Sequence, residues 1–219
     1  MTTIPLRIVV VDDHAVVRRG VRSLLESREG WEVVGEGTNG REAIDLVKRL
    51  QPNVVVMDLS LPELNGLDAT RQIVKEWPDT EVLVLTMHHS EQLARDVLQA
   101  GARGYVLKSD ADQSLIAAVE SLSRHQPFLT SKVTEFVLEG FMRGSDPAQE
   151  AAPKETATPR EREIIQLLAE GRSNKEVASS LGVSVKTIEA HRANIMRKLR
   201  LRSISDLVRY AIRNKIVQA

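Results

Sequence analysis

The chain of 219 residues contains no cysteine. This absence excludes disulfide bonds, thiolate metal sites and a cysteine nucleophile, and it fits a reducing compartment. Any chemistry that the protein carries out must therefore come from oxygen and nitrogen groups.

Long apolar runs are also missing. No stretch approaches the roughly 20 apolar residues that a helix needs to cross a bilayer, so we expect no contact with a membrane. The N-terminal stretch MTTIPLRIVVVDDH is short, runs into two aspartates and lacks a small-residue cleavage site. It is typical of a strand rather than a secretory signal, and we expect a cytoplasmic protein.

The chain as a whole has no excess of either charge sign, since it carries 30 basic and 30 acidic residues. Its two parts nevertheless differ. Residues 1–152 carry 16 Lys and Arg against 23 Asp and Glu, a net charge of −7, and residues 153–219 carry 14 against 7, a net charge of +7. A compact basic part beside an acidic one favours a polyanion as the partner of the C-terminal part.

Short apolar runs alternate with segments of helical period from residue 6 to about residue 123. Three runs, LRIVVV, NVVVMD and EVLVLT, are almost wholly apolar, as expected for strands buried on both faces of a parallel sheet. The predicted strands are Leu6–Val11, Glu32–Gly37, Asn53–Asp58, Glu81–Thr86 and Gly104–Lys108. The predicted helices are His14–Arg28, Gly40–Arg49, Gly66–Glu76, Glu91–Ala100 and Asp112–Leu122. Five such units predict a doubly wound α/β domain with a five-stranded parallel sheet.

This alternation stops after residue 123. The segment PFLTSKVTEFVLEGF is a candidate for one more helix, and MRGSDPAQEAAPKETATP is rich in small, polar and proline residues, as flexible linkers are. We predict one domain at 1–125, a linker at 126–157 and a small all-α domain at 158–219. The helices predicted in the second domain are Pro159–Glu170, Asn174–Leu181, Val185–Arg200 and Ile204 to about Asn214.

Charged and hydroxyl side chains follow the predicted strands at their carboxyl ends. The first strand ends in Asp12 and Asp13, the third in Asp58, the fourth in Thr86 and the fifth in Lys108. Ligands of open parallel sheets bind at this edge. Taken singly, each residue has a structural explanation, such as helix capping by the aspartates or solvation of the lysine. Their occurrence together at successive strand ends favours a common site.

Three carboxylates at one edge repel one another and raise each other's pKa unless a cation neutralises them. Mg²⁺ is predicted as the cofactor, because it suits one or two carboxylates together with a phosphate and several waters. Asp58 is then a candidate nucleophile toward a phosphoryl donor, with Lys108 and Thr86 contacting the phosphoryl oxygens. Three histidines lack metal-ligand spacing and are predicted to be structural or surface residues: His14, His88 and His89.

These residues and their spacing resemble the bacterial two-component response regulators, specifically those with a NarL/FixJ-type output domain, and the resemblance covers essentially the full chain. It implies a flavodoxin-like receiver domain in which Asp58 is the phosphoacceptor. It also implies that Asp13 and Asp58 bind Mg²⁺ directly, that Asp12 contributes through water, and that the backbone carbonyl of Ser60 is a further ligand. The family's phosphoryl donor is a sensor histidine kinase.

The same resemblance makes Lys108 and Thr86 phosphate contacts and Tyr105 the switch aromatic, which turns inward when Thr86 moves onto the phosphate. Two positions depart from the common family pattern. Ser109 stands where many receivers have proline, which puts the geometry of that loop in doubt. Met87 stands where a small residue is common, and we hypothesise that its side chain slows the access of water and small donors.

The basic part has the helix, tight turn and second helix of a DNA-binding helix-turn-helix, with Asn174–Leu181 as the scaffold helix and Val185–Arg200 as the recognition helix. At about 100° per residue, Ile188, Ile195 and Leu199 fall on the side that must face a core. The predicted DNA contacts are the residues on the opposite side and at the adjoining helix ends: Lys175, Lys186, Thr187, Glu189, Ala190, Ala193, Asn194 and Arg197.

The stretches TPRE, SNKEVA and VKTIEAHRANIMRKL are similar to the LuxR-type output domain. This similarity implies that Ile204–Asn214 is a dimerisation helix and that the phosphorylated protein binds promoter DNA as a homodimer. RNA polymerase is left open as a further partner. For Arg192, which falls nearer the core side, DNA contact and packing at the domain edge remain equally open.

We therefore predict a phosphorylation-switched transcription factor that supports its own phosphotransfer and is not a turnover enzyme. Two alternatives remain. One is a Mg²⁺-dependent phosphohydrolase with an aspartyl-phosphate intermediate, which would need a general acid/base that Asp58-Leu59-Ser60 does not offer. The other is a DNA-binding protein that is controlled by partner contact and whose acidic pocket is vestigial.

Overall fold

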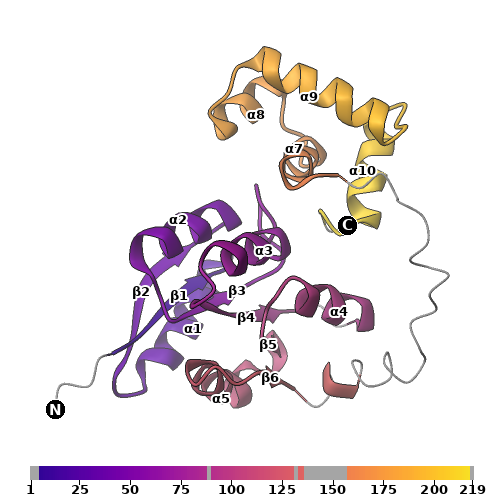
Figure 1. The fold of residues 1–219 in the computed structure, drawn as a ribbon. Coiled ribbons are helices and arrows are strands. Elements are labelled where there is room, and N and C mark those ends of the chain that lie inside the picture. The colour runs from indigo at the N-terminus through magenta and orange to yellow at the C-terminus, as the bar shows by residue number, and fades with distance from the viewer. Residues whose placement is uncertain (1–4, 88–89, 131–132, 136–156, 218–219) are drawn as a thin grey trace. The chain divides into compact units, whose positions relative to one another are not determined.

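The computed structural model describes residues 5–87, 90–130, 133–135 and 157–217. The chain divides into two compact units, Met1–Ser145 and Asp146–Ala219. The first unit is a parallel sheet flanked by helices, and the second is a group of four helices within its described residues (Figure 1). These architectures agree with the predicted α/β domain and the predicted all-α domain.

The sheet of the first unit has the strand order β2-β1-β3-β4-β5-β6, and all of its pairs are parallel. Its strands are β1 Leu6–Val11, β2 Trp31–Gly37, β3 Val54–Met57, β4 Glu81–Thr86, β5 Gly104–Leu107 and β6 Phe128–Leu129. The first five strands match the prediction to within one residue at each end. The prediction of only five strands missed β6, which is two residues long and lies in the segment predicted as linker. It is too short to produce a periodic signal.

Helices cover both faces of this sheet because the side chains of each strand alternate between the faces. On β1, Ile8 and Val10 share a core with helices α1 and α5, whereas Val9 and Val11 share a core with α2, α3 and α4. These helices are α1 Ala15–Glu26, α2 Gly40–Leu50, α3 Gly66–Glu76, α4 Glu91–Gln99 and α5 Ala111–Ser123. A short 3₁₀ turn, η1 Lys108–Asp110, precedes α5. Burial on both sides explains why the central strands are almost continuously apolar.

The second unit is built from α7 Pro159–Ala169, α8 Asn174–Leu181, α9 Val185–Lys198 and α10 Ile204–Arg213. Capping boxes begin α7 at Thr158 and α8 at Ser173. Each of these side chains accepts a hydrogen bond from the third helical N–H, and the glutamate at that third position accepts one from the backbone N–H of the capping residue. Gly182 ends α8 at a φ of 64°. That left-handed turn sends the chain directly into α9, as a helix-turn-helix requires.

In the described ranges, every helix is too short or too polar to cross a bilayer. Of the predicted linker 126–157, residues 133–135 are helical, and most of the remainder lies outside the described residues. The exact domain limits therefore stay a prediction.

Candidate functional site

The parallel register brings the predicted pocket residues to one edge of the sheet. Val11 pairs with Met57, so Asp12 and Asp58, which follow them, leave neighbouring strands at the same level. Thr86 pairs with Leu107 in the same way, which sets Lys108 beside the end of β4. The carboxyl edge of β1, β3, β4 and β5 therefore collects the side chains that were predicted to form a common site.

Lys108 bridges the two buried carboxylates of this edge. Its Nζ lies 2.6 Å from Oδ2 of Asp12 and 2.8 Å from Oδ2 of Asp58. Asp12 is 3% exposed and Asp58 is 2% exposed, so the ammonium is the main group that offsets the charge of the two acids. A buried carboxylate pair without such a cation would be strongly destabilised.

The electrostatics of the pocket follow from burial and from this bridge. Burial raises the pKa of the Asp58 carboxyl, although the hydrogen bonds from Lys108 and from the Leu59 N–H favour the ionised form. Burial lowers the pKa of Lys108, but its contacts with Asp12 and Asp58 outweigh this effect and the pKa is raised. Lys108 therefore carries a positive charge at neutral pH, where it is available to an anionic group on Asp58.

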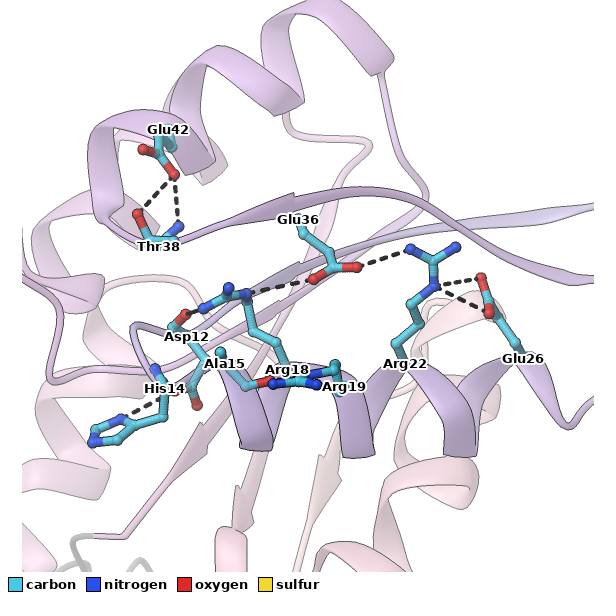
Figure 2. Close-up of polar contacts among 10 residues, drawn as sticks. All are labelled: Asp12, His14, Ala15, Arg18, Arg19, Arg22, Glu26, Glu36, Thr38 and Glu42. Carbon is cyan, nitrogen blue, oxygen red and sulfur yellow. Dashed lines mark hydrogen bonds and ion pairs between the residues drawn. The ribbon is translucent and has the colours of Figure 1, made fainter.

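A network of hydrogen bonds and ion pairs between charged side chains holds the loop between β1 and α1 (Figure 2). Arg18 Nη1 donates to the backbone carbonyl of Asp12 at 2.7 Å, and its Nε lies 3.4 Å from Oε2 of Glu36 on β2. Arg22, one helical turn later, donates to the other Glu36 oxygen at 2.9 Å and also to Glu26. Arg18 thus ties Asp12 to α1 and β2. This support was not predicted from the sequence, because its only local signal is the i, i+4 spacing of the two arginines.

Gly66 lies directly against the predicted phosphoacceptor, and this too was missed. Its N–H donates to the Leu59 carbonyl at 3.0 Å, and a Cβ added to it would meet the Asp58 carbonyl oxygen at 1.8 Å. On the same loop, the Leu59 N–H donates to Oδ1 of Asp58 at 2.7 Å. Only glycine lets α3 begin this close to the end of β3. The helix predicted from the sequence begins at this glycine, but the prediction did not include the close approach.

The acidic residues have the arrangement that a divalent cation needs. Asp12, Asp13, Asp58 and His14 each offer one ligand atom, and these atoms all lie within 4.8 Å of one another. Carboxylate oxygens are the ligands that Mg²⁺ prefers, and Asp13 is exposed enough for the ion to keep several waters. The residues present therefore fit a Mg²⁺ site. Ser60, the predicted source of a backbone ligand, is partly exposed beside them.

The two predicted switch residues are both inaccessible to solvent. Thr86 is 0% exposed and Tyr105 is 1% exposed. Tyr105 belongs to the core that includes α4, and burial raises the pKa of its phenol to about 12. Of the two family departures, Met87 is 66% exposed and Ser109 donates a hydrogen bond to Asp110. The predicted surface residues His88 and His89 lie outside the described residues.

The second unit exposes the predicted DNA-binding residues. Ile188 and Ile195 are fully buried and Leu199 packs against the same core, as the helical period predicted. The residues predicted to contact DNA are all exposed: Lys175, Lys186, Thr187, Glu189, Ala190, Ala193, Asn194 and Arg197. Arg192 is partly buried and donates to Oδ1 of Asn174 at 3.4 Å, which is consistent with packing against α8.

Each of the two units matches the model of a known protein family. The model of the response regulator receiver domain matches residues 8–120, and that of the bacterial regulatory proteins of the luxR family matches residues 155–211. The chain belongs to the response regulators with a LuxR-type output domain. It is a two-component response regulator with a DNA-binding domain and not a turnover enzyme, so the phosphohydrolase alternative is set aside.

Full-length relatives support this assignment. The oxygen regulatory protein NreC of Staphylococcus carnosus (strain TM300) is 42% identical over 215 residues, which cover 97% of this chain and 99% of NreC. The RcsB response regulator of Salmonella typhimurium is 28% identical, with a TM-score of 0.59 over 95% of this chain and 98% of RcsB. A structure of an RcsB–DNA complex aligns with a TM-score of 0.58 at 28% identity, over 94% of this chain and 97% of that one.

Proposed function

We propose that this response regulator accepts a phosphoryl group on Asp58 from a sensor histidine kinase, with Mg²⁺ held by Asp13, Asp58 and the Ser60 carbonyl and assisted by Asp12. The observation that carries the proposal is the Lys108 bridge, since it places one cation against two buried carboxylates at the carboxyl edge of a parallel sheet. That arrangement is suited to phosphoryl transfer, in which positioning and charge stabilisation do most of the work.

The transfer can be written with its atoms balanced. A carboxylate oxygen of Asp58 attacks the phosphorus of a phosphohistidine, the P–N bond breaks, and the histidine nitrogen leaves with the electron pair and takes up a proton. Mg²⁺, when bound, neutralises charge on the phosphoryl oxygens. The Lys108 ammonium contacts one of these oxygens, and the Thr86 hydroxyl donates a hydrogen bond to another.

We further propose that phosphorylation acts through Thr86 and Tyr105 to promote dimerisation and DNA binding in the cytoplasm. Both residues are buried on the adjacent strands β4 and β5, two positions apart in register, so the close packing of this region can couple a movement of Thr86 to Tyr105. Two RcsB dimers bound to DNA have been solved at 28% identity to this chain, which supports a dimer as the DNA-bound form. A second binding module raises affinity through its high effective concentration.

The test is phosphorylation of the full chain by acetyl phosphate in Mg²⁺. Wild type should gain one phosphoryl mass and bind promoter fragments more tightly, and Asp58→Asn should do neither. Asp45→Asn, which changes an exposed aspartate of α2, is the matched control and should behave as wild type. A phosphoryl gain in Asp58→Asn would overturn the assignment of the acceptor. No phosphoryl gain by wild type would favour the vestigial-pocket alternative, and unchanged DNA binding after wild type is phosphorylated would overturn the proposed coupling.

A further inference from the structure

The metal-facing cluster contains a nitrogen donor that the proposed Mg²⁺ site does not use. His14 follows Asp13 in the loop between β1 and α1, and its ring lies beside the loop segment that carries Asp12 (Figure 2). Its Nδ1 is 2.7 Å from Oδ1 of Asp13 and 3.3 Å from Oδ1 of Asp12. The ring therefore points its nitrogen at the carboxylate oxygens of Asp13, a proposed direct ligand, and of Asp12, which is proposed to assist.

These distances are those of a histidine paired with carboxylates, and they also lie near the spacing of neighbouring ligands on one ion. In an octahedral site with bonds of about 2.1 Å, adjacent ligand atoms lie about 3.0 Å apart. The two Nδ1 distances fall on either side of that value. The loop is also fixed: the His14 N–H donates to Oδ1 of Asp12 at 2.8 Å, and Arg18 holds the Asp12 carbonyl. These contacts fix the backbone at His14 close to both carboxylates.

We propose that His14 is a metal ligand that makes this pocket favour a transition-metal dication over Mg²⁺. The inference rests on the proposed metal site and adds its ion selectivity. Mg²⁺ is a hard ion that binds oxygen and gains little from imidazole, whereas Co²⁺, Ni²⁺ and Zn²⁺ accept imidazole readily. A site built from carboxylates alone distinguishes only weakly between Mg²⁺ and these transition metals. One nitrogen donor on the same face raises the affinity for Co²⁺, Ni²⁺ and Zn²⁺ more than the affinity for Mg²⁺.

This role differs from the structural or surface role predicted for His14 from the sequence. The sequence shows an isolated histidine with no i, i+4 partner, which is why it offered no metal-ligand spacing. The partners come from the fold instead, because β3 delivers Asp58 to the same edge where β1 delivers Asp12, Asp13 and His14. The side chain of His14 is 66% exposed, so an ion can reach it without displacing the core.

The experiment is a titration of the full, unphosphorylated chain with Mg²⁺ and with Co²⁺ by calorimetry. Wild type should bind Co²⁺ about tenfold more tightly than Mg²⁺, and His14→Gln should lose about tenfold in Co²⁺ affinity with less than a twofold change for Mg²⁺. The matched control is His125→Gln. His125 is also 66% exposed and also contacts a carboxylate, Glu81, but at the start of β4 rather than at the pocket edge. This variant should bind both ions as wild type does.

A spectroscopic readout separates ligation from indirect effects. The proton NMR spectrum of the Co²⁺ complex should show a strongly shifted, exchangeable imidazole N–H resonance in wild type that is missing from His14→Gln. Equal losses for both ions in His14→Gln, or no such resonance in wild type, would overturn the role of His14 while leaving the Mg²⁺ site in place. Binding of neither ion by wild type would instead overturn the metal site of the proposed function.

Discussion

The pocket and the recognition helix present charge in opposite ways. At the sheet edge, Asp12 and Asp58 are at most 3% exposed, and each depends on Lys108 for its charge balance. On α9 and the start of α8, every predicted DNA contact is exposed, and the buried side of α9 is formed by Ile188 and Ile195, with Met196 packed against the same core. Substitutions in the pocket should therefore change folding and function together, whereas substitutions on the recognition helix should change function alone.

The largest expected effect is the loss of receiver stability in Gly66→Ala. The added Cβ would lie 1.8 Å from the Asp58 carbonyl oxygen, so the loop must shift, and we expect destabilisation of about 3 kcal/mol or more. Urea unfolding followed by tryptophan fluorescence measures it, because both tryptophans, Trp31 and Trp77, lie in the receiver. Gly20→Ala is the control, since a Cβ there meets nothing within 4 Å and should be neutral or stabilising. Equal stability of Gly66→Ala and wild type would contradict the close approach.

An intermediate effect is expected on the recognition helix. Lys186→Ala and Arg197→Ala should each lower the affinity for promoter DNA by about tenfold and reduce the slope of log affinity against log salt by about one. Fluorescence anisotropy at several salt concentrations measures both. Circular dichroism should show an unchanged melting curve, because both side chains are exposed. Lys48→Ala, on an exposed position of α2, is the charge-matched control. A clear loss of melting temperature in either variant would contradict the expectation that substitutions on the recognition helix change function alone.

The smallest effect concerns the pH dependence of receiver stability. An acid whose pKa is raised on folding contributes stability that is present below its unfolded pKa and is lost as the pH rises through its folded pKa. Burial raises the pKa of Asp58, so Asp58→Asn should raise the receiver's melting temperature by a few degrees at pH 7 without divalent ions. The gain should disappear below about pH 4, where aspartate is protonated even when unfolded. Thermal melts of both proteins in EDTA from pH 3 to pH 8 measure this difference in melting temperature. A difference that does not change with pH would contradict the raised pKa of Asp58 as its cause.

The parts of the fold that could be predicted from the sequence are those marked by local patterns along the chain. The strands β1 and β4 and the helices α3 and α8 have the predicted ends, because apolar runs, helical period and caps mark them locally. The convergence of Asp12, Asp58 and Lys108 was also predictable, because parallel strands share their carboxyl edge.

The missed features depend on contacts between residues far apart in sequence. The close approach of Gly66 to Asp58 needs the end of β3 and the start of α3 in three dimensions. The tie from Arg18 to Glu36 joins α1 to β2. The sixth strand forms only because β5 offers an open edge to a two-residue segment. None of these contacts has a period or a motif that a single sequence displays.

The short strand β6 joins the chain that leaves the receiver to the strand β5. Its Leu129 pairs with Tyr105 on β5, and its Phe128 N–H donates to the carbonyl of Arg103 at 2.9 Å. The strand that carries the proposed switch aromatic is therefore also the strand to which the departing chain is fastened. A displacement of β5 would therefore also displace Phe128 and Leu129, where the chain leaves the sheet.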